Sequence, residues 1–309
     1  MSEGPTPYAR FGGAGVPSIE LWAEDCLEGL PRRVGAGGAD VIMTSPPYNR
    51  GVEYGRYDDR RPRAEYLAWI GRVAEAVRAA LAPNGSFFLN VGGSPTDPWL
   101  PLDVAQEVRS RLVLQNVIHW VKSIAIERAL AGRTPHLTGD IAVGHYKPVP
   151  SRRFLHGAQE YVFHFTHRGD VPLDRLAVGV PYQDKSNVAR WRGAGRDLRC
   201  RGNTWFLPYA TIRRRATDRP HPATFPPELP ERCYRLHGLS RIRLAVDPFV
   251  GLGASAVAAA QLRLPFVGFD VDAEYLATAT RRVAAVLSRP RARPAPRGRK
   301  THPTGPRLL

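Results

Sequence analysis

The alternation of short apolar runs with helical patterns constrains the fold more than any other feature of the sequence. Seven apolar runs have the length of a β-strand, and four longer stretches between them carry apolar residues at helical spacing. The runs are 19–22, 40–44, 86–91, 117–121, 161–165, 243–246 and 265–269, and the helical stretches are 64–81, 102–112, 254–262 and 273–287. This order predicts an α/β fold with a mostly parallel sheet and helices on both faces, in which ligands bind at the carboxyl ends of the strands.

Positive charge is concentrated in two parts of the chain. The formal net charge is +16, and the segment 147–220 holds 15 basic and 6 acidic residues. The final segment, 288–309, holds 7 basic residues and no acidic one. A polyanion partner is the natural inference, because each phosphate that a basic side chain neutralises releases counterions. The alternative is a basic surface that is only solvated.

Two segments depart from the alternating pattern. The stretch 168–219 is rich in Arg and Gly and includes Trp191 and Trp205. It lacks a clean period, so we expect an insertion with little regular structure. The Pro- and Arg-rich stretch 288–309 has the composition of a disordered tail.

Cysteine content and hydropathy favour a cytoplasmic protein. Cys26, Cys200 and Cys233 are widely spaced and form no CxxC pair, so neither a metal site nor a disulfide framework is expected. No apolar run approaches the roughly 18 residues of a membrane helix. The first residues lack the apolar core of a secretory signal. We therefore expect no membrane association.

The sequence Thr44-Ser45-Pro46-Pro47-Tyr48 directly follows an apolar strand. Two consecutive prolines fix φ and remove two backbone donors, which leaves the Ser45 hydroxyl and the Pro46 carbonyl as acceptors beside an aromatic ring. Such a set suits a base turned out of a duplex, because the acceptors can take the N–H bonds of an amino group while the Tyr48 ring stacks. The alternative is an ordinary turn at a strand end.

A second motif, Asp247-Pro248-Phe249-Val250-Gly251-Leu252-Gly253-Ala254-Ser255, follows a strand and opens a helix. Glycines allow a ligand to approach the backbone, and a helix N-terminus favours a negative group. Asp270 ends the next strand, where an acidic residue commonly binds ribose hydroxyls. Asp272 is the neighbouring alternative, although capping the following helix suits it better.

Together these motifs resemble those of the DNA amino-methyltransferases. Ser-Pro-Pro-Tyr is similar to their catalytic motif, and 247–255 is similar to their DPFxGxGxT donor loop, with Ser255 where Thr is usual. The segment 221–226 resembles their HPAxFP segment, and Glu24-Asp25-Cys26 resembles an acidic turn that reaches the donor's adenine. The order, with the catalytic motif first and the donor loop last, is that of the permuted beta class.

The resemblance implies a Rossmann-like S-adenosylmethionine-dependent methyltransferase fold with an inserted target-recognition region. The expected divisions are an N-terminal extension (1–18), a catalytic half (19–167), the target-recognition region (168–219), a donor-binding half (220–287) and a basic tail (288–309). Catalytic residues would be Ser45, Pro46, Pro47 and Tyr48. Donor-binding residues would be Asp25, Thr44, His221, Pro222, Phe225, Asp247, Pro248, Phe249, Gly251, Gly253, Ala254, Ser255 and Asp270. DNA contacts would come from Arg190, Arg192, Arg196, Arg199, Arg201, Arg213, Arg214 and Arg215.

The residues also separate the candidate reactions. Methylation at C5 of cytosine needs a Pro-Cys nucleophile, but Asp25, Arg199 and Arg232 precede the three cysteines. Deamination needs a zinc set with HxE and CxxC spacing, which is missing. Direct attack by an amino nitrogen on a sulfonium methyl needs only orientation and acceptors.

The expected activity is therefore methylation of cytosine N4 in duplex DNA by S-adenosylmethionine, in a restriction-modification or epigenetic context. Serine in the first position of the motif favours cytosine N4, and adenine N6 is the alternative within the class. An RNA base methyltransferase and an inactive DNA-binding protein are the rivals from other classes. The enzyme would work on the nucleoid, and both a homodimer and a cognate restriction endonuclease are compatible with the class.

Overall fold

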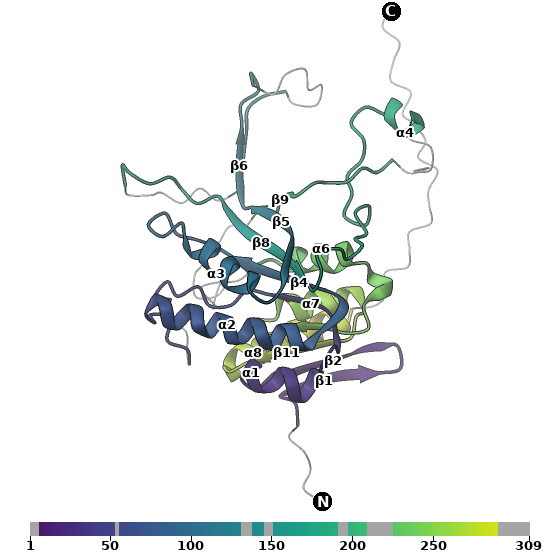
Figure 1. Ribbon diagram of the computed structural model, residues 1–309. Coiled ribbons are helices and arrows are strands. Elements are labelled where there is room, and N and C mark those ends of the chain that lie inside the picture. The colour runs from purple at the N-terminus through teal and green to yellow at the C-terminus, as the bar shows by residue number, and fades with distance from the viewer. Residues whose placement is uncertain are drawn as a thin grey trace, which may run out of the picture.

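The computed structural model describes residues 6–52, 56–130, 138–144, 151–190, 197–208 and 225–289. Within these ranges, a nine-stranded sheet has the order β1-β2-β11-β10-β3-β4-β8-β5-β9 (Figure 1). The strands are β1 (Ala9–Gly13), β2 (Val16–Ala23), β3 (Ala39–Thr44), β4 (Leu81–Val91), β5 (Val113–Val121), β8 (Gln159–Thr166), β9 (Thr204–Phe206), β10 (Ala245–Asp247) and β11 (Phe266–Asp270).

The centre of the sheet is parallel, as the alternation of strands and helices predicts. β2, β11, β10, β3 and β4 pair in parallel, whereas β8 runs antiparallel to β4 and β5, and β1 runs antiparallel to β2. Every predicted strand is present, although β10 begins two residues later than expected. The backbone N–H of Arg243 instead donates to the Asp40 carboxylate at 2.7 Å.

Helices cover both faces of the sheet, as predicted. One face carries α1 (Cys26–Gly29), the π-helical turn η1 (Leu30–Val34), α2 (Arg63–Ala80) and α3 (Leu100–Arg109). The other carries α6 (Glu228–His237), α7 (Ala254–Leu262) and α8 (Ala273–Leu287), with the 3-10 turn η2 (Leu239–Arg241) following α6.

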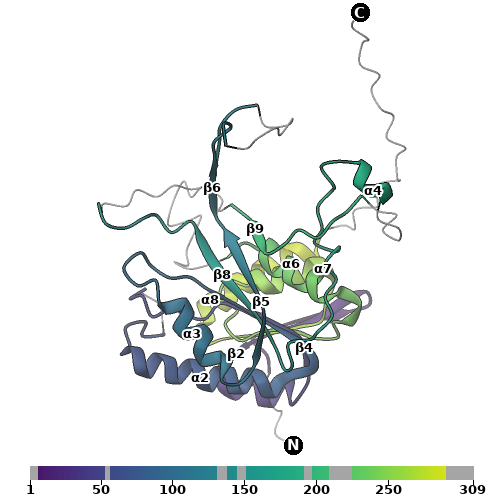
Figure 2. The same ribbon diagram turned by 45° about the horizontal axis from the view of Figure 1, so that its top comes forward.

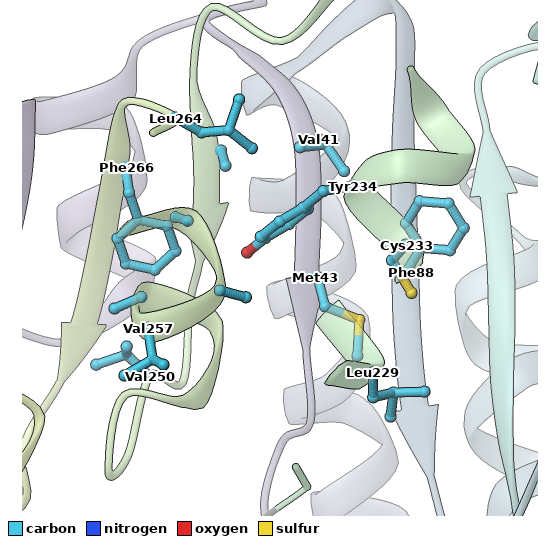
Figure 3. Close-up of a cluster of buried hydrophobic side chains, with 14 of the residues drawn as sticks. Val41, Met43, Phe88, Leu229, Cys233, Tyr234, Val250, Val257, Leu264 and Phe266 are labelled. Atoms are coloured by element: carbon cyan, nitrogen blue, oxygen red, sulfur yellow. The ribbon is translucent and has the colours of Figure 1, made fainter. Parts of the chain in front are cut away.

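Two apolar cores result, because successive side chains of a strand point to opposite faces. Val41 and Met43 of β3 belong to the core beneath α6 to α8, and Ile42 belongs to the core beneath α1 to α3. Figure 3 shows Tyr234 of α6 beside Val41 and Met43 in the first of these cores.

Both the catalytic half and the stretch 168–219 contain regular structure that the sequence did not predict. β6 (Ser123–Ile126) and β7 (Ile141–Gly144) form a hairpin that projects away from the sheet in both ribbon views (Figures 1 and 2). The predicted irregular stretch contains α4 (Ser186–Arg190) and β9, and β9 pairs in parallel with β5. Trp205 of β9 is 1% exposed, so its burial fixes a three-residue strand that is too short to produce a periodic signal.

Among the described residues, every helix is too short or too polar to cross a bilayer.

Candidate active site

The two sequence motifs lie side by side because their strands are neighbours in the sheet. β3 ends at Thr44, where the Ser45–Tyr48 turn begins, and β10 ends at Asp247, where the glycine loop begins. These strands run parallel, with Val41 opposite Ala245. The carboxyl ends of parallel neighbours meet at one edge, so residues about 200 positions apart in the chain form one site.

A pocket at this edge takes its walls from both motifs. The predicted residues that line it are Asp25, Ser45, Pro46, Pro47, Phe225, Pro248, Phe249, Gly251, Ala254 and Asp270. Residues that the sequence did not single out also contribute, among them Arg56, Tyr57, Arg61, Trp69 and Tyr275. The pocket therefore has an aromatic and a charged component beyond the motifs.

Asp247 fastens the two motifs together from behind the pocket. It is fully buried, and it accepts hydrogen bonds from Thr44 Oγ1 at 2.5 Å, from the backbone N–H of Phe249 at 2.9 Å and from Ser255 Oγ. Burial raises the pKa of the Asp247 carboxyl to about 6, and the three hydrogen bonds oppose that rise. Thr44, Asp247 and Ser255 thus support the loop and do not line the pocket, and their predicted contact with the donor stays a prediction.

The two glycines of the donor loop lie in different environments, one in the pocket wall and the other between two helices. Gly251 lines the pocket with φ of 49°, and its N–H donates to Asp270 Oδ2 at 2.9 Å. Gly253 has φ of 77°, and a Cβ added there would lie 2.6 Å from the Cβ of Ala279 on α8. Gly253 thus permits the close packing of α7 against α8, and its predicted contact with the donor stays a prediction.

Asp270 lies where the sequence places it, at the end of β11 in the pocket wall. Burial raises the pKa of its carboxyl to about 6, while hydrogen bonds from the N–H groups of Asp272 and Gly251 partly offset this effect. Asp272 accepts from the N–H of Glu274 at 2.9 Å and so caps α8, as expected.

The acidic turn after β2 also reaches the pocket. The Asp25 carboxylate accepts a hydrogen bond from the N–H of Leu27 at 2.8 Å, which makes Asp25 the N-cap of α1. Asp25 also lines the pocket. Glu24 beside it also lines the pocket and forms an ion pair with Arg33, joined by a 3.1 Å hydrogen bond. Asp25 thus caps α1 and also lines the pocket, and its contact with the donor stays a prediction.

Within the catalytic motif, Ser45 lies at the pocket surface and Tyr48 is buried beneath it. Ser45, Pro46 and Pro47 line the pocket, whereas Tyr48 is only 8% exposed and is absent from the wall. The Tyr48 hydroxyl lies 2.7 Å from Ser45 Oγ. The predicted stacking surface on the Tyr48 ring is therefore covered in this conformation, because the ring packs in the core beneath α2.

Three polar residues from other strands complete this cluster. Glu160 of β8 accepts from the Tyr48 hydroxyl at 3.0 Å and from Asn90 Nδ2 of β4 at 2.8 Å. Lys122, at the end of β5, donates to the other carboxylate oxygen of Glu160 at 2.9 Å. The sequence analysis missed all three. Asn90 was a readable signal, because it is a polar residue inside the apolar run 86–91, whereas Lys122 and Glu160 lie next to the runs 117–121 and 161–165.

Glu160 is an anion despite its burial. Burial alone would raise the pKa of its carboxyl, but the charge of Lys122 and the hydrogen bonds from Lys122, Asn90 and Tyr48 lower it below the ordinary value. The cluster thus holds one negative charge directly beneath the catalytic turn.

An aromatic wall faces the donor loop. Ring centroids are 5.4 Å apart between Tyr57 and Trp69, and also between Trp69 and Phe249. The guanidinium of Arg61 lies 4.7 Å from the centroid of the Tyr57 ring. Asp59 fixes the loop that carries these residues, because its carboxylate accepts from the N–H groups of Asn49, Arg50 and Val52.

Several predicted residues are not in the described part of the chain. These are His221, Pro222, Arg192, Arg196, Arg213, Arg214, Arg215 and the side chain of Arg190. Of the other two predicted DNA contacts, Arg199 is exposed, whereas Arg201 donates through Nε to the Val178 carbonyl at 2.9 Å. Arg201 therefore has a structural partner within the chain.

Comparison with known proteins agrees with this geometry. A family model described as DNA methylase matches residues 39–281. The chain belongs to this DNA methylase family. The match contains both motifs, so the predicted membership of the DNA amino-methyltransferases is confirmed.

Similar proteins include two type II methyltransferases. M.BglII of Bacillus subtilis is 27% identical over 250 residues, which are 77% of this chain and 61% of that protein. M.ScaI of Streptomyces caespitosus is 25% identical over 278 residues, which are 87% of this chain and 79% of that protein. The DNA methylase chain thus spans less than two thirds of the length of M.BglII.

Solved structures share the fold. The cytosine-N4-specific PvuII DNA methyltransferase matches with a TM-score of 0.61 and 17% identity over 92% of this chain and 94% of that chain. A structure from Thermus thermophilus in complex with S-adenosyl-L-methionine matches with a TM-score of 0.55 and 22% identity, over 87% and 94% of the two chains. The predicted Rossmann-like methyltransferase fold is therefore confirmed.

Proposed function

We propose that this DNA methylase transfers a methyl group from S-adenosylmethionine to N4 of cytosine in duplex DNA. The observation that carries the proposal is that Ser45, which follows β3, and Asp270, which ends β11, line the same pocket on either side of β10. The turn after β3 offers acceptors to an amino group, and the end of β11 offers a ribose-binding carboxylate.

The pocket residues fit the chemistry of the donor. Asp270 would accept hydrogen bonds from the ribose hydroxyls, and Gly251 allows the backbone to approach the ligand closely. Pro248 and Phe249 supply apolar contact beside the acidic turn at Asp25. S-Adenosylmethionine supplies an electrophilic methyl group on a sulfonium centre when it is bound.

The chain's contribution to the reaction is orientation and exclusion of water. Ser45 Oγ and the Pro46 carbonyl would accept the N–H bonds of the target amino group and draw its lone pair out of conjugation with the ring. The amino nitrogen would take the methyl group, the sulfur would leave with the bonding pair as a neutral thioether, and the extra proton on the nitrogen would pass by way of these acceptors to solvent. This direct route needs neither a metal nor a covalent intermediate.

The target base has to leave the duplex to reach Ser45. Its amino group is hydrogen-bonded inside a stacked pair and cannot approach a pocket between strand ends. Extrusion costs a few kcal/mol, and least where pairing is already weakened. A mismatch opposite the target base should therefore tighten binding.

Duplex DNA would be recognised by the basic segment 168–219. Arginine pairs well with guanine edges in the major groove, and phosphate contacts produce a steep salt dependence. Of the two predicted DNA contacts in the described residues, Arg199 is the exposed one. A restriction-modification context follows from the similarity to type II methyltransferases, and a homodimer and a cognate endonuclease belong to the same proposal.

The test is incubation of the purified protein with labelled S-adenosylmethionine and either duplex DNA or tRNA, followed by analysis of the nucleosides. N4-methylcytosine in DNA supports the proposal. N6-methyladenine keeps the family and changes the base. Label in tRNA alone, or donor-independent DNA binding with no label in either substrate, would support a rival.

A further inference from the structure

The hydrogen bonds behind Ser45 form a chain with a defined direction. Ser45 Oγ is 2.7 Å from the Tyr48 hydroxyl, and that hydroxyl is 3.0 Å from Oε2 of Glu160. Glu160 is 8% exposed, and an ionised carboxylate can only accept hydrogen bonds. The single proton of the Tyr48 hydroxyl therefore points to Glu160, which is a nearer and stronger acceptor than the Asn90 carbonyl at 3.3 Å.

The orientation of Asn90 supports this direction. Its Nδ2 donates to Glu160 at 2.8 Å and to the Tyr48 hydroxyl at 2.7 Å. The reverse orientation of the amide would place Oδ1 against a carboxylate. Because the Tyr48 hydroxyl gives its proton to Glu160, its remaining contacts with Asn90 and Ser45 must be ones in which it accepts.

The proton of Ser45 consequently points at Tyr48 and away from the pocket. Ser45 Oγ then has only lone pairs to offer: one is within 3.5 Å of Asn90 Nδ2, and the other is left for an amino group in the pocket that Ser45 lines. A serine hydroxyl can otherwise rotate and donate, which would set it against the N–H of an incoming amino group. A buried carboxylate two hydrogen bonds away removes that freedom.

We propose that Glu160, held by Lys122, is a positioning residue that fixes the direction of the Glu160–Tyr48–Ser45 hydrogen bonds and so makes Ser45 an obligate acceptor for the target amino group. The inference rests on the proposed amino-methyltransferase activity and assigns a role to two residues outside the two motifs. The charged and titratable groups that face Glu160 are Lys122 from β5 and Tyr48 from the turn after β3, and β4 adds the neutral Asn90.

The first test replaces Glu160 by an apolar side chain that has no hydrogen-bond acceptor. Glu160→Leu should lower kcat on DNA by about 100-fold, the usual effect of losing one oriented hydrogen bond at a reacting group. Donor affinity should stay within twofold, because Glu160 lies outside the pocket wall. Glu160→Gln, which keeps one acceptor oxygen, should restore part of the rate. Glu231→Gln, on a partly buried ion pair of α6 away from the pocket, is the matched control and should leave kcat unchanged.

The second test distinguishes a positioning role from a purely structural one through the pH profile. Lys122→Met removes the charge that keeps Glu160 ionised, so the pKa of Glu160 should rise and protonated Glu160 should donate to Tyr48. The kcat of this variant should fall on the acid side and recover at higher pH, whereas Lys122→Arg should follow the wild type. This measurement also decides the matter if Glu160→Leu does not fold.

A double-mutant cycle completes the design. If the three groups act as one chain, Tyr48→Phe combined with Glu160→Leu should be no slower than the slower single variant. The inference is wrong if folded Glu160→Leu keeps kcat within twofold, or if Lys122→Met has the pH profile of the wild type. The wild type is measured in the same assay. If it methylates DNA and the variants behave as just described, only this inference fails. If it does not methylate DNA, the proposed function fails, and the inference fails with it.

Discussion

Thr44 Oγ1 donates a hydrogen bond of 2.5 Å to Asp247 Oδ1, and these residues end the adjacent strands β3 and β10. The bond joins the turn that carries Ser45 to the loop that carries Phe249. Both partners are buried, at 1% and 0% exposure, so solvent cannot replace the contact. The distance between the acceptor serine and the donor pocket therefore depends on a buried pair that lies outside the pocket wall.

Thr44→Val should loosen this connection. The change keeps the shape and leaves a buried carboxylate short of one hydrogen bond, which costs about 1–3 kcal/mol of unfolding free energy. Donor affinity measured by calorimetry should also fall, because Asp247 holds Phe249 as well. Thr280→Val is the control, since Thr280 bonds only to the Leu276 carbonyl of its own helix in the described structure. Equal losses of stability and donor affinity at both positions would contradict a connecting role for the Thr44–Asp247 hydrogen bond.

Gly251 and Gly253 should respond differently to alanine. Both have positive φ, so each substitution carries a backbone cost of roughly 1–2 kcal/mol. Gly253→Ala adds the overlap with Ala279 and should lower thermal stability more. Gly251→Ala should weaken donor binding more, since Gly251 lines the pocket. Calorimetry measures donor affinity, and thermal unfolding measures stability. If Gly251→Ala lowered stability more and Gly253→Ala weakened donor binding more, the two assigned roles would be exchanged.

Donor affinity should fall as the pH drops through about 6. Burial raises the pKa of Asp270 to about 6, so its carboxylate is a full acceptor above that pH and becomes protonated below it. Loss of a charged hydrogen-bond acceptor corresponds to roughly 10- to 100-fold in affinity. Asp270→Asn should bind more weakly at neutral pH and lose this pH dependence. An Asp270→Asn variant with the wild-type pH profile would exclude Asp270 as the titrating group.

Much of this site could be predicted from the sequence because its motifs are local. Ser45 and Gly251 each lie within a few residues of a strand end, and parallel strands bring their carboxyl ends to one edge. The helix 254–262 was predicted with the bounds that the structure gives α7, because its apolar run ends where the chain turns at Arg263.

The missed residues depend on tertiary contacts that leave little local pattern. Glu160 matters because β8 lies between β4 and β5, which brings it between Asn90 and Lys122. Trp69 is one apolar position of an amphipathic helix, and only its 5.4 Å separation from Phe249 marks it as part of the site. The covering of the Tyr48 ring likewise follows from packing and not from the motif.

A buried histidine pair should make stability depend on pH. Ser86 Oγ lies 3.0 Å from His164 Nε2 and 2.9 Å from His237 Nδ1. Burial lowers the pKa of His164 to about 3 and that of His237 to about 4. The unfolded chain binds these protons below about pH 6.5 and the folded chain does not, so the unfolding free energy falls as pH decreases from about 6.5 to about 4.

His237→Gln isolates this effect from that of the buried carboxylates, whose raised pKa values act in the opposite direction. The variant should lose less stability than the wild type when urea unfolding at about pH 7 is compared with about pH 5. Parallel losses in the two proteins would show that His237 does not titrate on unfolding in this range.

The identity of the methylated base, and its dependence on Ser45, tests the central claim most directly. Duplex DNA treated with the DNA methylase and S-adenosylmethionine is digested to nucleosides and analysed by mass spectrometry, beside the same reaction with Ser45→Ala. We predict N4-methylcytosine with the wild type, and a loss of about 100- to 1000-fold with Ser45→Ala at unchanged donor affinity and thermal stability. N6-methyladenine as the product, or an undiminished rate in Ser45→Ala, would contradict the account.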